Sequence, residues 1–203
     1  MESSSLARKA GMIGIIGAIL WLIAVIMQYS LNLVEPDGSA LWIVNELIFL
    51  TALACVAVGF LGLISGGAVA NTFGKTVVIL YAVSRGLIII GGLANLFEVG
   101  QDSLLFVVFP IGGILSDISA LLIGIAVVTA KRWTGWQRWM PLVHFLVIFF
   151  AVSLPLALGV TPDGPGMAGE LIMGVMVLGV ALAVFKSAAN PRSYAVSPQA
   201  AQQ

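Results

Sequence analysis

The sequence has little charge and almost no cysteine. Only 9% of its 203 residues are charged, and nine lysines and arginines balance nine acidic residues. There is therefore no basic surplus to attract nucleic acid and no acidic tail. The one cysteine, Cys55, lies in an apolar run, which excludes an internal disulfide and a CxxC redox pair. Nucleic-acid partners and dithiol redox chemistry are not expected.

Apolar residues dominate instead. They make up 60% of the chain and give it a mean hydropathy of +1.11, too apolar for a soluble monomer. A membrane-spanning helix needs roughly 20 mostly apolar residues. Six segments meet this requirement: 11–29, 41–65, 75–97, 104–130, 139–160 and 167–186. The sequence therefore predicts an all-α, polytopic membrane protein, a bundle of six transmembrane helices in a lipid bilayer.

The positions of the basic residues predict the orientation of these spans, because lysine and arginine near span ends stay in the cytoplasm. Eight of the nine fall on one side of the predicted topology: Arg8, Lys9, Lys75, Lys131, Arg132, Arg138, Lys186 and Arg192. The opposite loops carry only acidic charges: Glu35, Asp37, Glu98, Asp102 and Asp163. We therefore expect both termini in the cytoplasm and a multi-pass location in the cytoplasmic (inner) cell membrane.

The chain divides into three parts on this interpretation. Residues 1–10 form a cytoplasmic N-terminal tail, and residues 11–186 form the six-helix transmembrane domain. Residues 187–203, rich in Ser, Ala, Gln and Pro, form a disordered cytoplasmic tail because they have little to bury. Trp133, Trp136 and Trp139 are expected to anchor the inner membrane interface.

The ninth basic residue, Arg85, lies within a predicted span. It is ten residues beyond Lys75, about 15 Å into the bilayer, and Asp117 is fourteen residues from both Ser103 and Lys131. Ionisable side chains are costly in hydrocarbon and tend to be paired and functional. Because both residues fall near the midplane of consecutive helices, we expect an Arg85–Asp117 ion pair. Such a pair can serve function or can only fix the register of two helices.

Other polar residues extend this predicted site. Ser84 and Asn95 share the third span with Arg85, and Ser116 precedes Asp117 among small residues that allow close helix packing. Glu46 lies about six residues into the second span, and we expect it to join Arg85 and Asp117. The six residues proposed for ligand binding are Glu46, Ser84, Arg85, Asn95, Ser116 and Asp117.

Catalytic and cofactor signatures are missing from the sequence. Its only histidine, His144, cannot ligate a haem from two sides or close a metal site alone, so we expect neither a metal nor a cofactor. A packing role for His144 is favoured over a proton relay. No recognisable motif supplies a nucleophile together with its base, and the case for an enzyme is weak.

One resemblance can be stated. The dipeptide Ser84-Arg85, Asn95 ten residues after the arginine, a small-residue fourth span and the sequence KRWTGWQRWMPL at 131–142 resemble a group of uncharacterised six-span bacterial membrane proteins that are classed as domains of unknown function. Asp117 departs from that pattern, in which an uncharged residue or a histidine is more typical. The resemblance implies a cytoplasmic-membrane location and no particular activity.

Three classes of function follow. The favoured one is binding or transport of a small solute or proton at the Arg85 site, with Arg85 holding an anionic or hydrogen-bonding group. The second is a non-catalytic accessory or assembly protein in which the charged residues are a structural ion pair, and the third is an intramembrane enzyme. Small-residue stretches at Gly14 and Ala18, at Ser116 and Ala120, and along 174–183 can serve packing within one chain or between copies in a homo-oligomer.

Overall fold

The computed structural model describes residues 2–33, 38–69, 71–97, 104–161 and 164–189, which are helical over most of their length and contain no β-strand. The helices are α1 (Glu2–Ser30), α2 (Ala40–Ser65), α3 (Thr72–Leu96), α4 (Leu104–Ala130), α5 (Gly135–Ile148), the π-helix η1 (Phe149–Ser153), α6 (Leu154–Ala157) and α7 (Gly166–Ala189). The all-α prediction is confirmed.

Six helices are long and apolar enough to cross a membrane, as the sequence predicted. The fifth is composite, because α5, η1 and α6 form one continuous stretch, Gly135–Ala157. Its π-helical turn lies directly before Pro155, whose ring excludes a regular backbone hydrogen bond. Helix α1 begins at Glu2 and so includes most of the expected N-terminal tail. The tail residues 190–203 lie outside the described residues.

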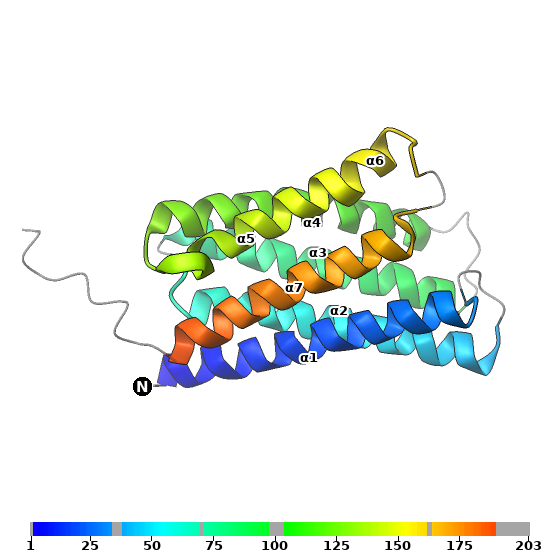
Figure 1. The fold of residues 1–203 in the computed structure, drawn as a ribbon, viewed down its shortest axis with the longest axis horizontal. Coiled ribbons are helices and arrows are strands. Elements are labelled where there is room, and N and C mark those ends of the chain that lie inside the picture. The colour runs from blue at the N-terminus through cyan, green and yellow to red at the C-terminus, as the bar shows by residue number, and fades with distance from the viewer. Residues whose placement is uncertain (1, 34–37, 70, 98–103, 162–163, 190–203) are drawn as a thin grey trace, which may run out of the picture.

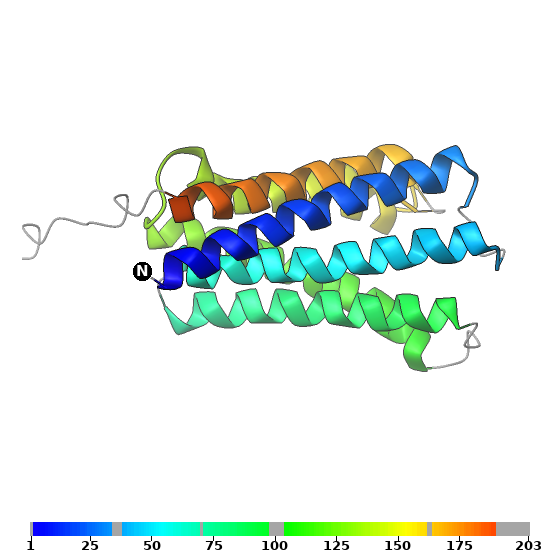
Figure 2. The same cartoon turned by 90° about the horizontal axis from the view of Figure 1, so that it is seen from below.

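The helices form a closed ring. Each packs against its neighbours in the order α1, α2, α3, α4, α5 and α7, with α7 returning to α1, and α2 also contacts α7 across the interior. The helices run roughly side by side along the long axis (Figures 1 and 2), and α1 begins at the end of the bundle where α7 stops. Side chains from several helices can therefore meet inside the ring.

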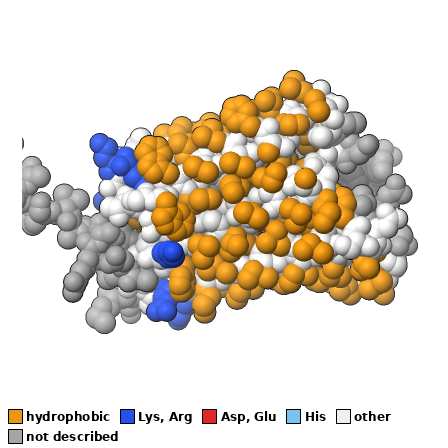
Figure 3. Space-filling model, in the orientation of Figure 1, with side chains coloured by type: hydrophobic (Ala, Val, Ile, Leu, Met, Phe, Trp, Pro, Cys, Tyr) orange, Lys and Arg blue, Asp and Glu red, His pale blue; other side chains and the backbone are white. Residues whose placement is uncertain are grey.

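One end of the bundle differs in charge from its flank. Hydrophobic side chains cover the long flank, whereas lysine and arginine gather at the end that holds the N-terminus (Figure 3). Three cation–aromatic contacts lie there: the Arg8 guanidinium is 5.3 Å from the ring centre of Phe185, the Arg138 guanidinium is 5.5 Å from that of Trp139, and the Lys186 ammonium is 5.6 Å from that of Trp136. An apolar flank with lysine and arginine near the ends of the helices is typical of helical membrane proteins.

Small residues bring α1 against α2 and α7. A Cβ added at Gly59 would lie 2.7 Å from the Cα of Gly14, so the two backbones approach too closely for a side chain at either position. A Cβ added at Gly14 would also lie 3.0 Å from the Cβ of Ala181, and Ala18 is fully buried. These small residues therefore serve packing within one chain.

Trp133 differs from its expected role as an interface anchor. Only 2% of it is exposed, and its indole nitrogen donates a hydrogen bond of 3.1 Å to the carbonyl oxygen of Gly66. It thereby ties the α4–α5 connection to the end of α2. Trp136 and Trp139 are 44% and 50% exposed, which agrees with a position at the membrane interface.

Candidate functional site

Arg85 lies on the inward face of α3, with 9% of its surface exposed. Its Nη2 atom donates a 2.6 Å hydrogen bond to the hydroxyl of Tyr81, one helical turn earlier. Its guanidinium carbon is 4.8 Å from the centre of the Tyr81 ring and 5.9 Å from that of Trp21 on α1. The buried cation is thus held between two aromatic rings, an arrangement whose electrostatic attraction grows when water is excluded.

The predicted ion pair between Arg85 and Asp117 is not formed. Arg85 contacts Tyr81 and Trp21, and no described acidic residue is its ion-pair partner. Both residues lie near the middle of their helices, α3 and α4, but this position does not fix the direction in which a side chain points. Arg85 shares its helix face with Tyr81 at i−4, and this local partner takes the place of the carboxylate.

The aromatic contacts continue from Tyr81 across the interior. The Tyr81 ring stacks on Phe60 of α2 at 4.1 Å between centres, and Phe60 lies 5.4 Å from the ring of His144 on α5. His144 is 1% exposed, interacts electrostatically with Arg85 and contacts the backbone of Met176 on α7. We call Trp21, Phe60, Tyr81, Arg85 and His144 the Arg85 cluster.

The Arg85 cluster has more hydrogen-bond donors than acceptors. The Trp21 Nε1 and Arg85 Nε atoms are buried donors without a hydrogen-bond partner among the described residues. The Nδ1 atom of His144 is also unpaired, but it is an acceptor, because the other ring nitrogen donates to the backbone of Met176. The Tyr81 hydroxyl accepts from Arg85, and its own proton has no acceptor in the described part of the chain. Buried polar groups are nearly always paired in native structures, so a net positive group of unpaired donors is typical of a site that takes an acceptor from outside the chain.

Glu46, Asn45 and Asn95 lie nearer the end of the bundle away from the N-terminus. The structure does not join Glu46 to Arg85: Glu46 is partly exposed, its Oε1 atom lies beside Gly92, and it has no polar partner among the described residues. Asn45 is buried with its Oδ1 atom unpaired, and Asn95 is partly exposed. These residues are close to the same end without forming a connected network with the Arg85 cluster.

The two predicted serines are buried between helices, and the Ser84 hydroxyl forms a hydrogen bond within its own helix. Ser84 is fully buried, and its hydroxyl donates to the carbonyl oxygen of Tyr81 at 2.7 Å. Its own carbonyl would lie 2.9 Å from a Cβ added at Gly112, which shows how closely α3 and α4 approach. Ser116 is also buried. Both serines support the close approach of the two helices that the small residues predicted.

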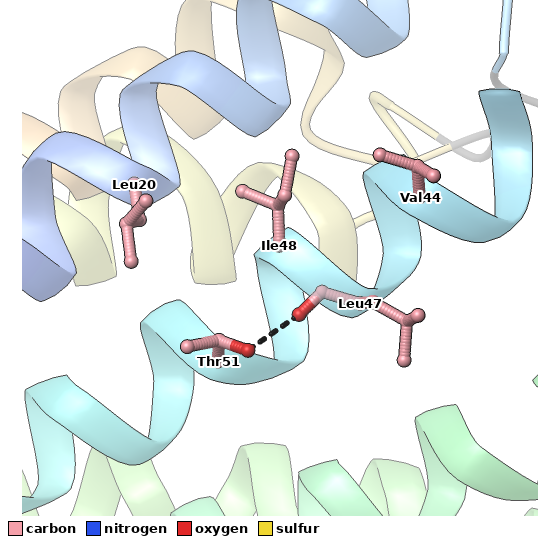
Figure 4. Close-up of a pocket in the computed structure, with 5 residues that line it drawn as sticks. All are labelled: Leu20, Val44, Leu47, Ile48 and Thr51. Carbon is pink, nitrogen blue, oxygen red and sulfur yellow. Dashed lines mark hydrogen bonds between the residues drawn. The ribbon is translucent and has the colours of Figure 1, made fainter.

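Two pockets open on the surface. One, of about 240 Å³, lies between α1 and α2 and is lined by Leu20, Val44, Leu47, Ile48 and Thr51. Figure 4 shows the Thr51 hydroxyl bonded back to the Leu47 carbonyl at 2.7 Å, so the pocket offers only an apolar wall. The other, of about 430 Å³, lies between the start of α3 and the end of α4, near Asn71 and Thr129. No residue of the Arg85 cluster lines either pocket.

Sequence reasoning did not place Trp21 and Tyr81 in the site. Tyr81 carried a usable signal, because a tyrosine four residues before an intramembrane arginine lies on the same helix face. Trp21 carried no such signal, since its contact with Arg85 depends on how α1 packs against the other helices. Within the described residues, no three His, Cys, Asp or Glu side chains gather as a metal site would need.

Fold and site together define the class of this protein: an all-α chain with six helices able to span a membrane and a guanidinium buried inside their ring. No protein-family model, curated protein or solved structure matches it.

Proposed function

We propose that this chain is a six-span protein of the cytoplasmic membrane, with both termini in the cytoplasm, that binds a small anionic or hydrogen-bond-accepting solute at Arg85. The observation that carries the proposal is the unpaired Nε atom of a buried arginine with no carboxylate partner among the described residues. A buried cation without a counter-ion is strongly disfavoured. A bound anion would supply the missing charge.

The neighbours of Arg85 fit this role. The Trp21 Nε1 atom belongs to the same cluster and is likewise an unpaired donor, so a bound acceptor has partners on α1 and α3. Arginine is suited to planar oxyanions because its guanidinium presents several donors in a fixed arrangement. The aromatic rings would exclude water and so strengthen each of these interactions. Small, planar anions such as carboxylates are the solutes that we expect to fit best.

A structural role for Arg85 is the second candidate. The guanidinium lies against two aromatic rings and bonds to Tyr81, and such contacts can hold α1 and α3 together without any solute. The chain would then be an accessory or assembly protein that acts through its helix surfaces. The two candidates differ in what removal of the charge does to the stability of the solute-free protein.

The test is thermal unfolding of the purified full chain in detergent, in sodium formate, acetate or nitrate at constant ionic strength, with gluconate as the bulky reference anion. Acetamide serves as a neutral acceptor. We expect at least one small solute to raise Tm in a saturable way, because a ligand that binds only the folded state stabilises it. Arg85→Met should abolish the rise, and Lys75→Met, which removes an exposed cation, should retain it.

The same experiment separates the candidates. If Arg85 serves binding, Arg85→Met without solute should unfold at the wild-type temperature or above it, because an uncompensated buried charge is lost. A lower Tm for Arg85→Met, together with no response of the wild type to any of the four solutes, would establish the structural role and contradict the proposal. Arg85→Lys, which keeps the charge and loses the planar donors, should weaken the solute response.

A further inference from the structure

Asp117 is a carboxylate at the centre of a membrane-spanning helix. It stands thirteen positions from each end of α4, Leu104 and Ala130, which is roughly 20 Å of helix on either side at 1.5 Å per residue. It is partly exposed at the surface of the bundle. A charge at this depth has hydrocarbon beside it, with the headgroups out of reach of its short side chain.

No partner for this carboxylate is present among the residues that the structure describes. Asp117 forms no hydrogen bond or ion pair with any residue that the structure describes. Arg85, the intramembrane cation, is turned inward to Tyr81 and Trp21. Intramembrane carboxylates usually pair with another polar group, and none of the described residues supplies one to Asp117.

The surface around Asp117 is shaped for a helix. We define the Asp117 face as Gly113, Ile114, Asp117 and Ile118. Gly113 lies one turn before the carboxylate, and a Cβ added to it would meet nothing within 4 Å. Ile114 and Ile118 are 64% and 51% exposed. A glycine and a polar residue at i and i+4, bordered by exposed isoleucines, allow a second helix to approach closely and to reach the carboxylate.

Charge complementarity decides between possible occupants. A second copy of this chain would bring its own Asp117 to a symmetric interface, where two carboxylates repel. It could not offer Arg85, which is buried in its own interior. The remaining described lysines and arginines lie at or near the ends of helices, far from the midpoint of α4. A different chain must supply the cation.

We propose that the Asp117 face docks a transmembrane helix of another membrane protein that carries an arginine or lysine near its midpoint. The ion pair would form in hydrocarbon, where it fixes the depth of the partner helix, and Gly113 would admit the partner backbone. This inference is independent of solute binding at Arg85, because the Arg85 cluster shares no residue with the Asp117 face.

The test uses a designed helix as the probe: a polyleucine transmembrane peptide with one central arginine, a dansyl label and no tryptophan. It is reconstituted with the full chain in phosphatidylcholine vesicles, and energy transfer from the five tryptophans of the chain reports association. We expect the arginine peptide to associate about tenfold more strongly than the all-leucine peptide. Asp117→Leu should remove this difference. Gly113→Leu should remove it as well, because the larger side chain fills the space that lets the partner helix come close.

Two controls keep the result interpretable. Glu46→Gln removes another intramembrane carboxylate and should leave association unchanged. Asp117→Asn has a side chain of nearly the same size and removes only the charge, so it serves if Asp117→Leu fails to fold. This variant should lose most of its preference for the arginine peptide over the all-leucine peptide. Equal association of both peptides with the wild type would overturn the proposal, as would undiminished binding of the arginine peptide to Asp117→Asn. Self-association of the wild type that depends on Asp117 would assign the face to a second copy and would also overturn it.

Discussion

Arg85 shows how a membrane interior can hold a cation with aromatic groups. Its only hydrogen-bond acceptor in the described part of the chain is the Tyr81 hydroxyl, and the rings of Tyr81 and Trp21 flank its guanidinium. Each of these contacts is weaker than a buried ion pair, and none of them neutralises the positive charge of Arg85. No described carboxylate neutralises Arg85, and under the proposed function a bound anion would do so.

At this scale, Tyr81→Phe tests the local partner of Arg85. The change keeps the ring that stacks on Phe60 and removes only the hydroxyl, so that Arg85 loses its hydrogen bond while buried. We expect a loss of about 1–3 kcal/mol in the free energy of unfolding, measured by chemical unfolding in mixed micelles. Thr129→Val is the matched control: its hydroxyl bonds to its own helix at the carbonyl of Ile125, and its removal should change stability by less than about 0.5 kcal/mol.

The packing of α1 against α2 depends on residues with no side chain. Gly14 and Gly59 face each other so closely that a Cβ at either would enter the other backbone. Gly59→Ala should therefore lower the free energy of unfolding by about 1–3 kcal/mol, the cost of overpacking. Gly86→Ala is the control, because a Cβ there meets nothing within 4 Å.

The two alanine variants should differ in their effect on the free energy of unfolding. Alanine favours a helix over glycine by up to about 1 kcal/mol, so Gly86→Ala should be neutral or stabilising. Thermal unfolding of both variants in the same detergent compares them directly. An equal loss in both would contradict the close approach of α1 and α2.

The connection between α4 and α5 is held to α2 by one indole. Trp133→Phe removes the hydrogen bond to Gly66 and leaves a space in a buried site, and we expect a loss of about 1–3 kcal/mol in the free energy of unfolding. Trp136→Phe should change stability by less than about 0.5 kcal/mol because Trp136 is exposed. Limited proteolysis at Arg132 should become faster in Trp133→Phe alone.

On the scale of the whole molecule, lysine and arginine side chains gather at the end of the bundle that holds the N-terminus (Figure 3), the end that we propose lies in the cytoplasm. The proposed topology predicts which positions a membrane-impermeant maleimide can reach in intact cells that express the chain. With Cys55 replaced by alanine, single cysteines at Leu31 and Leu158, which lie at the end away from the N-terminus, should react from outside. Cysteines at Ser5 and Thr72 should react only after the membrane is permeabilised. The reverse pattern would invert the proposed topology.

Some properties of this protein follow from local sequence alone. The number of apolar segments, their lengths and the asymmetry of lysine and arginine between loops are one-dimensional quantities, and the first two were enough to predict six long helices that the structure contains. The depth of Arg85 and Asp117 in their helices followed from counting residues. Counting residues is effective for helices in lipid, because a helix must form all of its own backbone hydrogen bonds wherever water is excluded.

The partners of these residues were decided only by the tertiary structure. Whether Arg85 meets Asp117, Glu46 or an aromatic ring depends on the rotation of each helix about its axis. Because a span carries hydrophobic residues on every side, the sequence does not indicate which side faces the interior. Close packing at glycines such as Gly14 and Gly59 sets it instead. That packing turned Arg85 toward Tyr81 and Trp21, left Asp117 without a partner in the described chain and brought His144 into the interior.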